Sequence, residues 1–110
     1  MRGLIQKIRN RATQSKTKSD AVSIEKSDLQ KIRFTKIEVL ENEEEKMNRK
    51  INLQKALQLG NLYKQKVSIY FENEGSKKHT HATVWHVDDK NVCLKGGAFI
   101  PVHSIYKIVL

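Results

Sequence analysis

A chain of 110 residues has room for one domain with an extension, and it is too short for two separate hydrophobic cores. Its 38% hydrophobic and 30% charged residues are typical of a globular domain, and no run approaches the ~18 apolar residues of a membrane-spanning helix. The 21 Lys and Arg residues exceed the 12 Asp and Glu residues, and this formal charge of +9 favours partners such as nucleic acid or an anionic membrane.

The beginning of the chain is its most basic part. Residues 1–20 hold six Lys and Arg residues and one Asp, which gives a charge of +5. Apolar side chains share one helical face at residues 1–12 and would allow peripheral contact with a membrane or a partner, but so short a helix is marginal in water. We therefore expect residues 1–26 to be a flexible, disordered basic arm and residues 27–110 to be the domain. In the alternative interpretation the charge only keeps a small protein in solution.

A helix is predicted ahead of the strands. Asn42 is placed to cap its first turn, and the three glutamates at 43–45 complement the positive end of the helix dipole. Gly60–Asn61 is typical of a helix end. We predict a helix over residues 43–59 that packs over an open end of the strand structure, and an accessory strand or extended segment at residues 34–40.

Five short strands and one helical turn are predicted after this helix. From residue 67 onward apolar residues alternate with polar ones, and turn signals such as Asn73–Ser76 and Gly96–Gly97 recur at short intervals. Pro101 has no amide hydrogen for a ladder, so a strand ends there or lies at an edge. The predicted strands are 67–72, 78–87, 91–95, 98–100 and 105–110, with a 3₁₀ turn at 102–104.

This order of elements resembles that of Sm-like and Src-homology-3-like (SH3-like) small β-barrels, most clearly in the glycine, apolar residues, proline, turn and strand of Gly97–Ile105. The resemblance implies a mainly β, α+β fold: a five-stranded small barrel preceded by one helix and the basic arm. The peptide-binding residues of one group and the RNA-binding residues of the other find no match here, so no functional residue is transferred. Residues 36–110 also look similar to a set of short bacterial proteins without an assigned activity, through 36–43, Leu59–Asn61 and Ile100–Pro101.

The sequence contains no recognisable catalytic motif. Asp88 and Asp89 are adjacent, so their side chains diverge, and no phosphate-binding or nucleophile motif occurs. His79 and His81 have a spacing that would suit one zinc ion, but a structural site needs four ligands, and solvent-facing histidines are the simpler interpretation. We expect no catalytic residue, no metal, no cofactor and no enzyme activity. The single cysteine, Cys93, excludes an intrachain disulfide and, with the resemblance above, predicts a bacterial cytoplasmic protein.

Trp85 is the central candidate for ligand binding. If Ala82 and Val84 face the core, Trp85 faces outward; in the opposite register it fills the core or a contact between subunits. Exposed aromatic rings stack on nucleic-acid bases while lysines contact the phosphates. The candidate nucleic-acid interface consists of Lys64, Lys66, Tyr70, Lys78, Trp85 and Lys95.

Two classes of function fit this pattern. The first is a small-barrel module that binds nucleic acid, RNA or a single strand, largely through electrostatic attraction. The alternative is a protein–protein interaction module, or a self-assembling homo-oligomer without catalytic activity, in which an exposed edge strand pairs with another chain.

Overall fold

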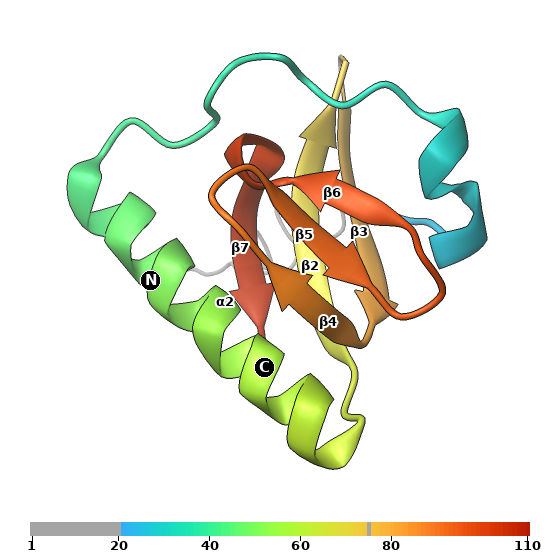
Figure 1. The fold of residues 1–110 in the computed structure, drawn as a ribbon. Helices are drawn as coiled ribbons and strands as arrows, with labels where there is room; N and C mark the ends of the chain where they lie inside the picture. The colour runs from blue at the N-terminus through green and yellow to red at the C-terminus, as the bar shows by residue number, and fades with distance from the viewer. Residues whose placement is uncertain (1–20, 75) are drawn as a thin grey trace, which may run out of the picture.

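The computed structural model describes residues 21–74 and 76–110, which form an α+β domain of one long helix and seven strands (Figure 1). The predicted α+β class is therefore confirmed. Within these residues no helix combines the length and the apolar character that crossing a bilayer requires. The elements in chain order are β1 (Val22–Ser23), η2 (Lys26–Lys31), α2 (Glu43–Tyr63), β2 (Val67–Asn73), β3 (Ser76–Ala82), β4 (Val84–Val87), β5 (Asn91–Leu94), β6 (Phe99–Pro101), η3 (Val102–Ser104) and β7 (Ile105–Val109).

The larger of two sheets has the strand order β1–β3–β2–β7. β2 and β3 form an antiparallel hairpin, β7 pairs antiparallel with the other edge of β2, and β1 pairs in parallel with β3. Because β1 belongs to this sheet and Ala21 is buried, these residues, which were expected to belong to the arm, are part of the folded domain. Residues 1–20 of the expected arm lie outside the described residues.

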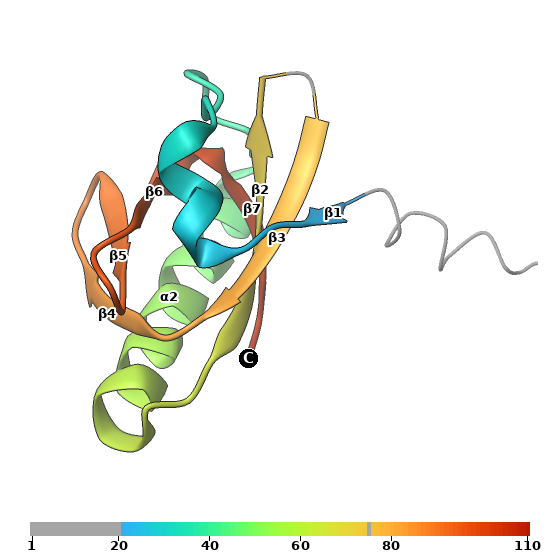
Figure 2. The same cartoon turned by 90° about the vertical axis from the view of Figure 1, so that its right-hand side faces the viewer.

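The smaller sheet has the order β4–β5–β6. Only Thr83 separates β3 from β4, so a single bent stretch of chain leads from the larger sheet into the smaller one (Figure 2). The predicted strand at 78–87 is thus split between two sheets. This bend lets the inner faces of both sheets enclose one core.

The expected closed barrel is not present, because the strands lie in two open sheets. In the described part of the chain β6 borders only β5, and β7 borders only β2. The sides between the sheets are occupied by helical segments: α2 contacts β4 and β7, and η2 contacts β3 and β6 (Figure 2). Leu53 and Ala56 of α2 and Leu29 of η2 complete the core in place of a further ladder.

Alternation along the strands supplies the rest of the core. Along β2 the residues Val67, Ile69 and Phe71 are buried, and the residues between them face the outer side of the larger sheet. The buried apolar residues of the strands and their connections are Val67, Ile69, Phe71, Ala82, Val84, Val92, Leu94, Ala98, Ile100, Ile105 and Ile108.

The helix α2 begins as predicted and ends later than predicted. The Asn42 side chain accepts hydrogen bonds from two amides of the first turn. The helix continues past residue 59 to Tyr63, and Gly60 packs inside it: a Cβ there would lie 2.1 Å from the carbonyl oxygen of Val84. Glycine thus lets α2 approach β4 closely, and the chain leaves the helix at Lys64 with a left-handed φ of 56°.

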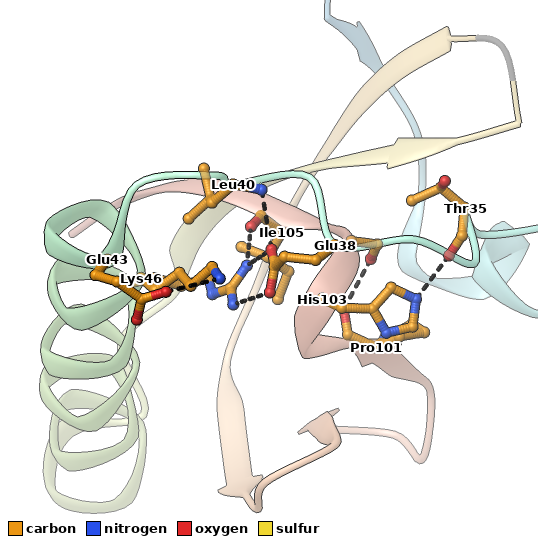
Figure 3. A network of polar contacts seen from close by, with 10 residues as sticks. Thr35, Glu38, Leu40, Glu43, Lys46, Pro101, His103 and Ile105 are labelled. Atoms are coloured by element: carbon orange, nitrogen blue, oxygen red, sulfur yellow. Dashed lines mark hydrogen bonds and ion pairs between the residues drawn. The ribbon is translucent and has the colours of Figure 1, made fainter.

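Residues 32–42 connect η2 to α2 across one end of the two sheets. The predicted strand at 34–40 is reduced here to one isolated bridge, between Phe34 and Asn73. The His103 ring nitrogen Nε2 lies 2.7 Å from the carbonyl oxygen of Thr35, which fastens the connection to η3 (Figure 3).

An ion pair fastens the same connection to α2 (Figure 3). The guanidinium of Arg49 donates two hydrogen bonds of 2.7 Å to the Glu38 carboxylate and one of 2.9 Å to the carbonyl oxygen of Ile105. The Arg49 side chain is 8% exposed. Its hydrogen bond to Glu38 lowers the pKa of that carboxyl below its ordinary value, despite the opposing effect of burial.

Candidate nucleic-acid interface

Half of the six predicted interface residues come together. Lys64, Trp85 and Lys95 lie where α2 ends beside the start of β4. Lys66 is exposed in the short connection between α2 and β2.

The other two predicted residues lie on the larger sheet, on opposite faces. Tyr70 faces outward, between the buried Ile69 and Phe71. Lys78 lies opposite Phe71 in the ladder, and cross-strand partners share a face, so Lys78 is half-buried on the inner side. Lys78 therefore does not share a face with Tyr70.

Trp85 faces outward at a β-bulge of β4. Ala82 and Val84 are 1% and 0% exposed, whereas Trp85 is 46% exposed. The ladder to β5 shifts between Val84 and His86, so Trp85 is the extra residue of the strand. The outward register on which the predicted interface depends is the one observed. His86, which simple alternation places with the inward residues, is exposed because of the bulge.

The C-terminus of α2 holds Lys64 over the indole. The amide of Lys64 donates to the carbonyl oxygen of Gly60 at 3.0 Å, and its own carbonyl oxygen accepts a 3.4 Å hydrogen bond from the hydroxyl of Thr83. Its Nζ lies 5.6 Å from the centroid of the Trp85 ring, within the range of a cation–π contact. Lys64 and Trp85 thus form one positively charged aromatic corner.

Thr83 also positions a second lysine. The amide of Lys95 donates to the Thr83 carbonyl oxygen at 2.8 Å. Lys95 begins the β5–β6 hairpin, in which Gly96 and Gly97 have φ values of 101° and 100° that favour glycine. Lys26 of η2 reaches this hairpin, since a Cβ on Gly96 would lie 3.4 Å from the Lys26 Nζ. Three elements therefore contribute a lysine to this end of the smaller sheet.

Phe99 supplies a second exposed ring and was not among the predicted residues. It is 52% exposed and lies opposite Cys93 in β5, which in turn lies opposite His86. Trp85 and Phe99 thus stand on the outer face of the smaller sheet two strands apart, about 10 Å between backbones. The sequence signal that could have identified it is the alternation of Phe99 with Ile100, which is buried and therefore leaves Phe99 facing outward. We call Lys26, Lys64, Trp85, Lys95 and Phe99 together the Trp85 surface.

The Trp85 surface is positively charged. None of its lysines forms an ion pair within the described part of the chain. Asp88 and Asp89 lie in the turn at the opposite end of β4. There, hydrogen bonds from the amides of Asn91 and Lys90 lower the pKa of Asp88, which favours its charged form. This negative charge lies at the other end of β4 from Lys64 and Lys95.

The outer face of the larger sheet carries a second group of aromatic and basic side chains. The Tyr70 and His79 rings are stacked with centroids 4.9 Å apart, and Tyr106 lies 6.0 Å from Tyr70. The ammonium group of Lys107 lies 5.5 Å from the Tyr70 ring, and that of Lys77 lies 5.3 Å from the Tyr106 ring. We call these five residues the Tyr70 cluster.

The histidines of the larger sheet make contacts with neighbouring side chains. His79 stacks on Tyr70, and the His81 ring nitrogen Nδ1 lies 3.2 Å from the hydroxyl of Ser68. Among residues 21–74 and 76–110, no three His, Cys, Asp or Glu side chains gather in a way that could hold a metal ion.

Comparisons with protein-family models, with curated proteins and with solved structures give no match to this chain.

Proposed function

We propose that this protein binds single-stranded nucleic acid on the Trp85 surface. The observation that carries the proposal is the placement of two half-exposed aromatic rings and three lysines on one end of the smaller sheet, where these lysines form no ion pair with the described residues. Nonspecific single-strand binding combines these two parts: rings on which bases stack and cations that follow the phosphates.

The arrangement favours a single strand over a duplex. Trp85 and Phe99 lie on an open sheet face, where unstacked bases have access to their rings. Bases inside a duplex are already stacked on one another and expose only their edges in the grooves. The surface therefore suits RNA or DNA in single-stranded form.

The charge distribution supports the same ligand. The described residues hold 15 Lys and Arg and 11 Asp and Glu, a net +4, and residues 1–20 add +5. These six basic residues join the domain through β1, at the edge of the larger sheet. We expect the affinity to fall steeply as the salt concentration rises, because cation–phosphate contacts release counterions.

The strand order supports the kinship with small barrels that was inferred from the sequence. Following the bent β3–β4 strand, the order is β7–β2–β3/β4–β5–β6, with η3 between the last two strands in sequence. We propose that this arrangement is an opened form of the SH3-like or Sm-like barrel that the sequence resembles. Small barrels host many functions, so the ligand is argued from the Trp85 surface and not from the fold.

Trp85 makes the proposal directly testable, because it is the only tryptophan of the chain. Intrinsic fluorescence should be quenched when single-stranded RNA or DNA is titrated at low salt, and the same titration with labelled oligonucleotide should show an anisotropy rise. Duplex DNA should bind more weakly at equal nucleotide concentration. Absence of both quenching and anisotropy change at low salt would refute the proposal.

Matched variants locate the site. Replacement of Lys64 and Lys95 by Gln should lower the slope of log affinity against log salt by about 0.7 for each lost phosphate contact. The change Trp85→Ala should cost about 1–3 kcal/mol of binding free energy. Lys50→Gln is the control, because Lys50 lines a hollow beside Asp88 and Asp89, at the other end of β4. Because Lys50→Gln removes one charge and the Lys64/Lys95 variant removes two, an effect of the control half as large as that of the double variant would show that only net charge matters.

The second candidate function is self-association or binding of a protein partner through a strand edge. The observation that favours it is the outer edge of β7, which pairs with no strand in the described residues and ends in Val109 and Leu110, 44% and 47% exposed. Light scattering over a concentration series tests self-association, and a constant monomer mass would exclude it.

A further inference from the structure

The Trp85 surface and the Tyr70 cluster lie along the same bent strand. β3 and β4 are separated only by Thr83, and the residues of β3 that face outward are Lys77, His79 and His81. Trp85 continues this outward series in β4. The outer side of one continuous stretch of chain thus carries residues of both groups.

Two lysines cover the bend between the groups. At Thr83 the strand is buried under the end of α2, where the Thr83 hydroxyl bonds the carbonyl of Lys64. The chain then passes through the exposed Lys66 into β2, where Ser68 contacts His81 on the outer face. This path from Trp85 to His81 runs over Lys64, Lys66 and Ser68. The acidic residues of α2 and β2 lie elsewhere, at residues 43–45 and 72.

We propose that the bound single strand continues from the Trp85 surface over Lys64 and Lys66 and onto the Tyr70 cluster. This inference rests on the proposed function and adds the path and the length of the site. From Lys77 to Trp85 the strand spans eight residue steps, about 26 Å at ~3.3 Å per residue. A single strand with a rise of ~3.4 Å per nucleotide would cover that length with roughly eight nucleotides.

The Tyr70 cluster has the composition that such a continuation needs. Lys77 and Lys107 present ammonium groups above tyrosine rings, so phosphate contacts and aromatic surface occur together. Glu72, which lies opposite Lys77, is the acidic residue of β2, β3 and β7 on this face. The strand β1 pairs in parallel with the β3 edge of the same sheet.

The test compares two lengths of ligand in two double variants of the full-length protein. Lys77→Gln/Lys107→Gln should weaken binding of an oligothymidylate dodecanucleotide about fivefold or more and should leave a tetranucleotide within about twofold. Lys64→Gln/Lys95→Gln should weaken both ligands. Lys50→Gln is again the control. Both lysines of the first pair are exposed, so their replacement should leave the thermal midpoint unchanged, which circular dichroism checks.

The outcomes separate this inference from the proposed function. Unchanged dodecanucleotide affinity in Lys77→Gln/Lys107→Gln, with normal quenching of Trp85, would refute the continued path and leave the Trp85 surface in place. Equal affinity of wild type for both lengths would refute it as well. Absence of binding to either ligand would refute both proposals. If polyglutamate of matched charge displaces the labelled dodecanucleotide as effectively as unlabelled dodecanucleotide does, the path binds an acidic polypeptide instead.

Discussion

Replacing Gly60 by Ala should loosen α2 from the smaller sheet. A Cβ at this position would lie 2.1 Å from the carbonyl oxygen of Val84 and 3.2 Å from the Cγ2 of Thr83. The first of these atoms belongs to the backbone, so either the helix or β4 must move. Overpacking of this kind costs up to about 3 kcal/mol, while alanine gains about 1 kcal/mol of helix propensity over glycine. The expected net loss is about 2 kcal/mol.

This loss should lower the midpoint of thermal unfolding by about 10 °C for a domain of this size. Urea and thermal unfolding followed by Trp85 fluorescence measure it. They also report on the site, because the Gly60 carbonyl oxygen accepts the hydrogen bond from the amide of Lys64, whose ammonium group lies over the indole. The matched control is Asn61→Ala, an exposed position in the same helical turn, which should change stability by less than about 0.7 kcal/mol. If Gly60→Ala were as stable as wild type, the close approach of α2 to β4 described above would be incorrect.

Three further perturbations test how the connection, the helix and η2 are held. Glu38→Gln should cost about 2 kcal/mol, because it leaves the buried guanidinium of Arg49 without its charged partner. Because the pKa of Glu38 is lowered in the folded state, this ion pair stabilises the protein at pH values above the ordinary carboxyl pKa of 4.5. Its contribution is lost as the pH falls through the lowered pKa. Glu38→Gln should therefore lose less stability than wild type when both are titrated with acid over that range. Asn42→Ala should cost about 1 kcal/mol by removing the helix cap, measured by urea unfolding, and an unchanged midpoint would contradict that role. Leu29→Ala should cost about 2–5 kcal/mol, since Leu29 is 1% exposed and fills the core from η2; a smaller loss would show that η2 is dispensable.

Local patterns predicted the elements well, since alternation and turn residues identify strands from neighbours in sequence. The start of α2 followed from Asn42 and the glutamates, and the outward face of Trp85 followed from the apolar Ala82 and Val84. The later end of α2 could not be foreseen, because a glycine that packs against a distant strand looks the same in sequence as a glycine that ends a helix.

The arrangement of the site depended on features that have no local signal. The bulge at Trp85 shifts His86 to the outer face, and an inserted residue does not disturb the composition of the strand. Lys78 was predicted to flank the exposed aromatic rings, but the register of the hairpin places it on the face opposite to that of Tyr70. Barrel closure could not be judged either, since it depends on how α2 and η2 fill the space between the sheets.

One edge strand of each sheet has a feature that hinders pairing with a further strand. β6 is three residues long and ends in Pro101, which offers no amide hydrogen to an incoming strand. At β7 the carbonyl oxygen of Ile105 is already engaged by Arg49. One arginine therefore both fastens the connection before α2 and occupies one acceptor at the start of β7, so an incoming strand would have to pair with the other end of this edge, near Val109.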